Sequence, residues 1–237
     1  MGSLNVRQPA VAGLFYQRDP DLLRDTVDSL LAAAAAEPGA RPRALIVPHA
    51  GYRYSGATAA SAYRRLLPWR RDIRRVVLLG PAHQVDLERI ALPGRQRFAS
   101  PLGEVVIDTE LAATAARLPG VCVSAQAHRQ EHALEVQLPF LQRVLDNFTL
   151  LPLLVGHCPP AQVAAVIDAL WDGPETLLLV STDLSHFHSY REAQCLDNRT
   201  CQRLLRHDRA LSGEDACGAN ALNGLMASVH VQQLSVE

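Results

Sequence analysis

Short apolar runs alternate with stretches of helical periodicity along most of this 237-residue chain. Continuous apolar runs are typical of strands buried on both faces of a sheet. They predict strands at 43–47, 75–79, 149–154 and 176–181, with shorter candidates at 89–92, 104–107 and 121–124. Because helices separate these strands, we expect an α/β fold with a mostly parallel central sheet and helices on both faces.

Apolar residues at helical spacing, together with capping residues, predict the helices. The first begins after Asp19, a favoured N-cap, with Pro20 at the first helical position. Residues 51–56 read as a loop. Further helices are predicted over 58–67, 109–118, 131–145, 160–170, 190–206 and 216–229. No linker, repeat or low-complexity segment divides the chain, so we expect a single domain over 1–237.

Composition narrows the class of protein. The chain is 48% hydrophobic and 20% charged, with a net charge of −1, as suits a globular domain. It has no basic stripe, which argues against nucleic acid, and no apolar run long enough for a membrane span. The five cysteines are scattered without a CxxC pair, and no signal peptide is evident. We therefore expect a reducing, cytoplasmic setting.

Histidines follow three of the predicted strands. His49 and His83 come shortly after the strands at 43–47 and 75–79, and His186 follows the strand at 176–181. Ligands of open α/β sheets bind beyond the carboxyl ends of the strands. Three imidazoles at that edge predict a metal or acid/base site. For His49 or His83 alone, a histidine bonded to backbone at a strand end is an equally good interpretation.

Two acidic residues, Asp183 and Glu131, lie close in sequence to candidate histidines. Asp183 precedes His186 by one helical turn and would fix its tautomer, although an N-cap role explains Asp183 as well. Glu131 and His132 open a predicted helix, but the second histidine of an HExxH zinc site is absent. A salt-bridged helix start is one interpretation of this pair. The functional alternative is that Glu131 or His132 orients a ligand or substrate.

Cys217 stands at the predicted start of the last helix. The positive end of a helix dipole favours thiolate, which is the form that binds metals. The alternative is a small buried apolar residue, as most free cysteines are. We hold that second interpretation for the remaining cysteines, which are Cys122, Cys158, Cys195 and Cys201.

Several of these segments together resemble the Memo family, which is called AmmeMemoRadiSam system protein B in bacteria and archaea. The matching segments occur in the family's order at 12–16, 48–56, 79–83, 131–140, 181–186 and 216–218. Two of them, PHAGYRYSG at 48–56 and EHALEVQLPF at 131–140, are specific enough to make chance agreement very improbable.

The resemblance implies a fold similar to class III extradiol dioxygenases, which hold non-haem iron(II) with two histidines and one carboxylate. It implies that His49, His83 and Cys217 are the metal ligands, with thiolate in place of carboxylate. It also implies that His186 is the acid/base histidine, and we expect Asp183 or Glu131 to tune it. The residues expected at the substrate pocket are Phe15, Tyr16 and Tyr54.

The thiolate makes this ligand set softer than a facial triad. Iron(II) is therefore the first expectation for the metal, with copper and zinc as alternatives, and ring-cleaving activity does not follow automatically. One function that fits is a metal-dependent redox enzyme of dioxygenase-like character. A zinc hydrolase fits less well, because nothing marks a hydrolase substrate.

The alternative to a redox enzyme is a non-catalytic adaptor whose pocket binds a peptide or small molecule. The family name implies radical-SAM and AMMECR-type proteins as partners. Family members usually continue with a further strand after the helix at 216–229. That strand is not found here, so we expect a C-terminal segment shorter than is usual.

Overall fold

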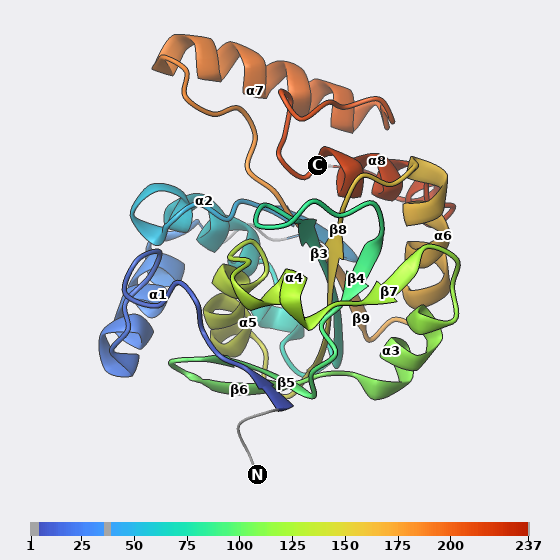
Figure 1. Ribbon diagram of the computed structural model, residues 1–237. Coiled ribbons are helices and arrows are strands. Elements are labelled where there is room, and N and C mark those ends of the chain that lie inside the picture. The colour runs from blue at the N-terminus through green and yellow to red at the C-terminus, as the bar shows by residue number, and fades with distance from the viewer. Residues whose placement is uncertain (1–4, 36–38, 237) are drawn as a thin grey trace.

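The computed structural model describes residues 5–35 and 39–236 around a central six-stranded sheet (Figure 1). The strand order is β2-β9-β3-β8-β4-β7. These strands are β2 (Ala44–Val47), β3 (Arg75–Pro81), β4 (Ile90–Leu92), β7 (Val121–Val123), β8 (Thr149–Val155) and β9 (Thr176–Ser181). The first four in this order are parallel, whereas β4 pairs antiparallel with β8 and parallel with β7. The predicted α/β fold with a mostly parallel sheet is confirmed.

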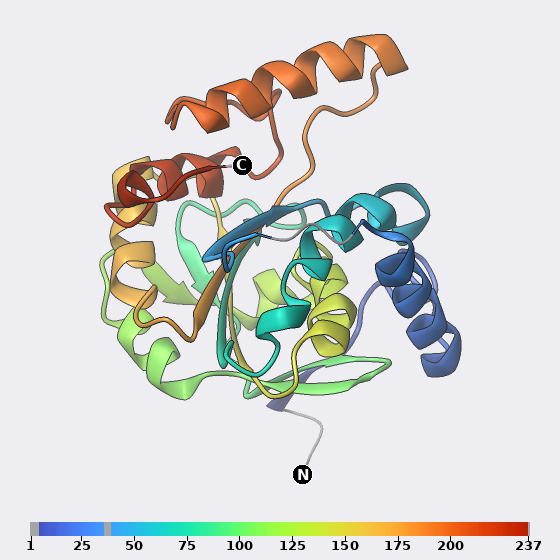
Figure 2. The ribbon, with the colours of Figure 1, turned by 180° about the vertical axis from the view of Figure 1, so that it is seen from behind.

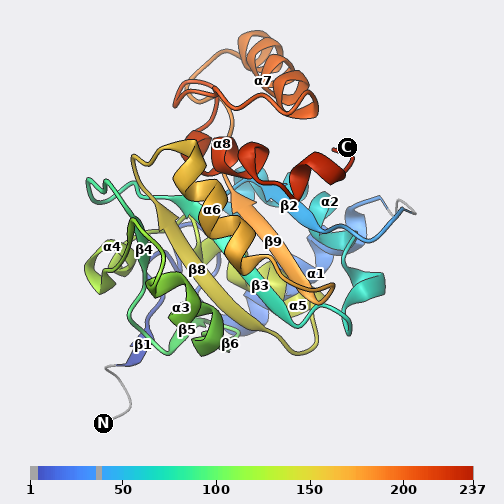
Figure 3. The same cartoon turned by 90° about the vertical axis from the view of Figure 1, so that its right-hand side faces the viewer.

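The central sheet separates two hydrophobic cores. Val76 and Leu78 of β3 face one core, and Val77 and Leu79 face the other. Because side chains alternate along a strand, burial on both faces requires the continuous apolar run seen in the sequence. Helices α1 (Pro20–Ala33), α2 (Tyr52–Arg64) and α5 (Leu138–Val144) cover one face, and α3 (Thr109–Ala116), α6 (Pro160–Leu170) and α8 (Ala219–Ala227) the other (Figure 3).

One predicted helix begins earlier in the structure than expected. The predicted loop at 51–56 belongs to α2, which starts at Tyr52 rather than Thr58. Gly56 lies inside this helix, where a Cβ would come within 2.9 Å of Leu30 on α1. This glycine therefore permits close packing of two helices instead of forming a turn.

The predicted helix at 131–145 is wrong over its first half. Residues 131–134 are not helical, the 3-10 turn η3 (Glu135–Gln137) follows, and α5 begins at Leu138. The Glu131 side chain accepts a hydrogen bond from the Ala133 backbone N–H at 3.0 Å and from the His83 backbone N–H at 2.5 Å. These bonds tie the segment to the end of β3 in an irregular conformation.

A smaller sheet lies at the opposite end of the molecule from the carboxyl edge. It has the order β1-β5-β6, and its strands are β1 (Val6–Arg7), β5 (Arg97–Ser100) and β6 (Gly103–Val106). Neither β5 nor the short helix α4 (Ala125–Arg129) was predicted from the sequence. In the described ranges, no helix combines the length and apolar character needed to cross a bilayer.

Helix α7 (Tyr190–Leu205) stands apart from the body, beyond the carboxyl edge of the sheet (Figures 1 and 2). Its buried residues are Thr200 and Leu204. The segment that leads from β9 into α7 carries Asp183 and His186, and the segment that returns to α8 carries Cys217. The connections of this outlying helix thus contribute candidate site residues.

Candidate metal centre

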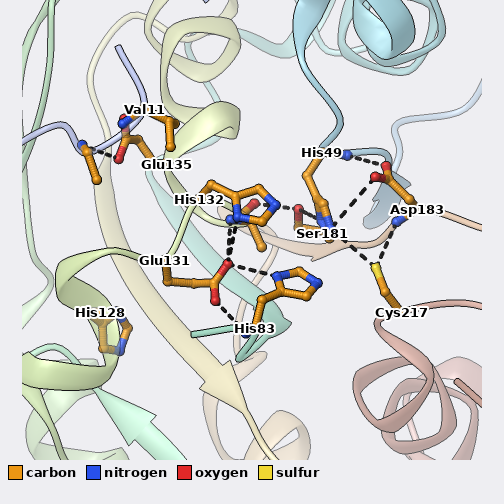
Figure 4. A network of polar contacts seen from close by, with 12 residues as sticks. Val11, His49, His83, His128, Glu131, His132, Glu135, Ser181, Asp183 and Cys217 are labelled. Carbon is orange, nitrogen blue, oxygen red and sulfur yellow. Dashed lines mark hydrogen bonds and ion pairs between the residues drawn. The ribbon is translucent and has the colours of Figure 1, made fainter. Parts of the chain in front are cut away.

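Histidine and cysteine side chains meet at the carboxyl edge of the central sheet (Figure 4). His49 follows β2, His83 follows β3 and Cys217 precedes α8. Cys217 Sγ lies 3.2 Å from His49 Nε2, and the rings of His49 and His83 are 5.2 Å apart. A ligand atom from each of His49, His83 and His132 also falls within 4.8 Å of the other two. The fold therefore assembles a set of nitrogen and sulfur donors around one point.

Cys217 lies in a loop and not in the first turn of a helix. Helix α8 begins at Ala219 with Gly218 as its N-cap, so the predicted helix starts too early. A Cβ on Gly218 would lie 2.7 Å from the Thr182 Cβ, and glycine therefore allows the loop to approach the end of β9. The Cys217 backbone N–H donates to the Asp183 carbonyl at 3.2 Å, which fixes the thiol at the cluster.

The surroundings of Cys217 favour its thiolate. Burial alone would raise the thiol pKa, but the interactions with His49 and His83 lower the pKa to about 5. The Asp183 backbone N–H contributes as well, at 3.3 Å from Sγ. The lowered pKa thus comes from groups of the cluster, whereas the sequence had suggested the dipole of the following helix.

Glu131 holds both the backbone and the ring of His83. Its carboxylate is 1% exposed, and Oε1 lies 2.9 Å from His83 Nδ1. A carboxylate only accepts, so Nδ1 donates and Nε2 faces Cys217 (Figure 4). Burial alone would lower the pKa of His83, but hydrogen bonds to Cys217 and Glu131 raise it to about 10. Burial would raise the pKa of Glu131, but hydrogen bonds from His83 and Ala133 lower it to about 2.

His49 is 2% exposed and is held at its ring and its backbone. Its Nδ1 lies 3.0 Å from Ser181 Oγ, at the end of β9. Asp183 Oδ1 accepts hydrogen bonds from the backbone N–H groups of His49 at 2.7 Å and Ala50 at 3.2 Å. The turn after β2 is thus clamped to the end of β9, and Nε2 is left facing Cys217.

His186 lies at the rim of the cluster with its side chain 40% exposed. Its Nε2 is 3.6 Å from Asp183 Oδ2, and that same oxygen is 3.9 Å from His49 Nε2. Asp183 therefore stands between the rim histidine and a candidate ligand. The acid/base role of His186 stays a prediction.

His132 approaches the cluster from another side and stacks on His83. The two rings are 4.8 Å apart with an interplanar angle of 17°, and Phe15 packs against His132 at 4.7 Å. His132 Nδ1 lies 3.3 Å from Glu131 Oε1. Burial is the largest influence on His132 and lowers its pKa to about 4, so this ring is neutral near pH 7.

The three residues predicted at the substrate pocket have different surroundings. Phe15 is half-buried and contacts His132. Tyr16 is buried, and its hydroxyl donates to Glu135 Oε1 at 2.5 Å. Tyr54 is exposed on α2. Among the ring contacts of the described chain, only that of Phe15 links one of these three to the clustered histidines; the pocket role of all three stays a prediction.

Sequence reasoning did not single out Ser181 and Gln137, two buried residues that support the site, and it did not find the structural role of Glu135. Ser181 contacts His49, and Gln137 Nε2 donates to Ser181 Oγ at 2.7 Å. Glu135 is fully buried and anchors the N-terminal segment. Glu135 and Gln137 fall inside the EHALEVQLPF block, so the specificity of that motif was the available signal.

The fold and the cluster define an α/β protein with a candidate histidine/cysteine metal centre at the carboxyl edge of its sheet. The family model described as Memo-like protein matches residues 7–221. The chain therefore belongs to the Memo-like family, as the sequence motifs had suggested.

Curated relatives agree with this assignment. Over 199 residues the chain is 36% identical to a MEMO1 family protein of Aquifex aeolicus, covering 82% of this chain and 72% of that protein. A MEMO1 family protein of Methanothermobacter thermautotrophicus is 34% identical over 221 residues, with coverage of 86% and 78%. One of Sulfolobus acidocaldarius is 31% identical over 239 residues, with coverage of 90% and 84%.

Proposed function

We propose that this protein binds a redox-active metal through His49, His83 and Cys217 and uses it in a dioxygenase-like redox reaction. Iron(II) is the first candidate and copper the second. The observation that carries the proposal is the approach of Cys217 Sγ to His49 Nε2 at 3.2 Å. His83 is among the groups that lower the pKa of the same thiol. Two imidazoles and a thiolate suit iron, copper or zinc better than magnesium or calcium.

Cys217 is a better third ligand than His132. A metal lies in the plane of each imidazole that binds it. The rings of His132 and His83 are stacked 4.8 Å apart at 17°, so one metal ion cannot lie close to both ring planes. The lowered thiol pKa also provides the deprotonated form that a metal requires.

The residues around the ligands have distinct roles in this proposal. Glu131 orients His83, and Asp183 fixes the backbone of His49. His186, partly exposed and beside Asp183, transfers protons to or from a ligand. Neutral His132 and the adjacent Phe15 form the wall that orients an organic substrate. The metal, when bound, supplies one-electron chemistry or polarises a bound oxygen atom.

Metal analysis of protein purified without oxygen tests the proposal. We expect about one iron or copper per wild-type chain, and much less in His49→Ala and Cys217→Ser. Cys201→Ser is the matched control, because Cys201 is exposed on α7 and should leave metal content unchanged. Full metal content in Cys217→Ser would contradict the thiolate assignment. Oxygen consumption by the loaded protein tests the redox step.

A non-catalytic adaptor is the second candidate, and one observation favours it. The pKa of His83 is raised and that of Cys217 is lowered, so the two side chains attract each other as cation and thiolate in the absence of metal. In this alternative the pocket binds a peptide or small molecule. Radical-SAM and AMMECR-type proteins are the proposed partners of either function. A metal-free wild type that binds such a partner would favour the adaptor.

A further inference from the structure

A chain of buried polar side chains extends behind His49, away from the metal centre. Its members are Ser181, Gln137 and Tyr63, each no more than 1% exposed. The Tyr63 hydroxyl donates to Gln137 Oε1 at 2.8 Å, and Gln137 Nε2 lies 2.7 Å from Ser181 Oγ. Ser181 Oγ in turn lies 3.0 Å from His49 Nδ1.

Backbone carbonyls fix the direction of every hydrogen bond in this chain. The Pro48 carbonyl is 2.9 Å from Gln137 Nε2, and since a carbonyl only accepts, this atom must be the amide nitrogen. The Ala133 carbonyl is 2.6 Å from Ser181 Oγ and takes the single hydroxyl proton of Ser181. The lone pairs of Ser181 Oγ are then left for Gln137 and His49.

The far end of the chain is equally determined. Burial raises the pKa of Tyr63 well above its ordinary value, so the hydroxyl keeps its proton and donates it to Gln137 Oε1. That bond leaves Gln137 no freedom to exchange its oxygen and nitrogen. Its amide therefore always presents N–H, never a carbonyl, to Ser181.

We infer that Ser181 and Gln137 are positioning residues that hold the proton of His49 on Nδ1 and reserve Nε2 for a ligand. Ser181 can offer His49 only an acceptor, so Nδ1 must donate. This inference rests on the proposed function in one respect, which is that the ligand at Nε2 is a metal. A hydrogen bond to the second ring nitrogen is the usual means by which proteins orient a metal-binding histidine.

Nitrogen NMR of histidine-labelled protein tests the inference directly. Long-range proton–nitrogen spectra distinguish protonated from bare ring nitrogens, and His49→Ala identifies the signals of His49. We expect Nδ1 of His49 to be protonated in the metal-free and the zinc-loaded wild type. A bare Nδ1 in either state overturns the inference, even if the variants below fail to fold.

Ser181→Ala should let the metal-free protein populate His49 with its proton on Nε2. It should also lower zinc affinity by about 10–100-fold. Tyr63→Phe should have a smaller effect in the same direction, because Pro48 still anchors the Gln137 amide. Thr176→Val is the matched control: it lies at the other end of β9, is equally buried, and its hydroxyl has no partner.

The outcomes separate this inference from the proposed function. A folded Ser181→Ala protein with the wild-type tautomer and zinc affinity would overturn the positioning role. A wild type that carries its proton on Nδ1 but binds no metal would support the positioning chain and contradict the metal function. A wild type that binds zinc but has a bare Nδ1 would support the metal function and contradict the positioning chain.

Discussion

Glu131 and Glu135 lie one helical turn apart in sequence, both almost fully buried, yet they support different regions of the molecule. Glu131 faces the metal centre and binds the backbone and ring of His83. Glu135 faces away, pairs with Arg7 and accepts the backbone N–H groups of Ala10 at 2.7 Å and Val11 at 3.0 Å. One carboxylate orients a candidate ligand, and the other fastens the N-terminal segment to the core.

The irregular backbone between the two glutamates explains this division. In a helix, residues four apart share one face, and both carboxylates would point the same way. Residues 131–134 are not helical, so the two side chains diverge. A single motif thus serves function at one end and stability at the other, and the two effects should be separable by mutation.

The largest expected effect is on stability, from Glu135→Gln. The change leaves Arg7, whose side chain is 4% exposed, without its anionic partner. Loss of one member of a buried ion pair typically costs about 3–5 kcal/mol of unfolding free energy. Urea denaturation measures the loss, with the exposed Glu88→Gln as control. Zinc content of the folded fraction should be unchanged; reduced zinc content without loss of stability would contradict the division.

Glu131→Gln should produce the opposite pattern. The amide cannot accept from His83 Nδ1 as strongly as a carboxylate does, so His83 loses orientation. We expect zinc affinity to fall by about 10–100-fold. The loss of unfolding free energy should be smaller than for Glu135→Gln, about 1–3 kcal/mol, because His83 is partly exposed to solvent whereas Arg7 is almost fully buried. Competition with a zinc-binding dye measures the affinity, and a wild-type value would show that Glu131 is not needed to orient His83.

These two glutamates also illustrate which features could be predicted from the sequence and which could not. The long strands and the helix that begins at Pro20 were predicted, because local periodicity and capping determine them. Strand topology also made the meeting of His49 and His83 foreseeable, since parallel strands deliver their carboxyl ends to one edge. The divergence of Glu131 and Glu135 could not be predicted in this way. Glu135 binds residues more than a hundred positions away in the sequence, and such contacts leave no local pattern.

Local sequence patterns also could not predict the antiparallel pairing of β4 with β8, or the positioning residues Ser181 and Gln137. Whether β4 runs parallel or antiparallel to β8 depends on long-range pairing, which its short apolar run does not encode. Ser181 reads locally as the end of a strand, and Gln137 as one position of a helix. Their connection to His49 exists only after β2, β9 and η3 have packed together.

A milder change, Tyr16→Phe, tests whether Tyr16 belongs with Glu135 or with the pocket. Its hydroxyl donates to the buried Glu135 carboxylate, and hydrogen bonds to charged groups contribute about 1.5 kcal/mol or more. Tyr52→Phe is a matched control that loses a bond to the neutral Val136 carbonyl, with an expected cost of about 1 kcal/mol. Thermal or urea unfolding measures both. Weakened zinc or ligand binding by Tyr16→Phe at normal stability would instead favour the pocket role.

The smallest expected effect is on the reactivity of Cys217 in metal-free protein. The pH dependence of this reactivity also distinguishes the two glutamates. Thiolate is the reacting form, so alkylation of wild-type Cys217 should rise with pH through about 5 and be constant above it. Cys158 and Cys201 should react only at alkaline pH, because the pKa of each is raised, by burial at Cys158 and by partial desolvation beside Asp197 at the surface residue Cys201. Iodoacetamide labelling mapped by mass spectrometry follows all the thiols together.

Glu131→Gln should move the Cys217 midpoint upward. Without the Glu131 carboxylate, the His83 ring is no longer held in position beside Cys217, so its interaction with the sulfur weakens and the thiolate loses stabilisation. The expected shift is about one pH unit, the usual effect of one nearby charge. Glu135→Gln, in its folded fraction, should keep the midpoint near 5, because the bonds of Glu135 run to the N-terminal segment. Equal midpoints in the two variants would mean that Glu131 does not act on Cys217 through His83.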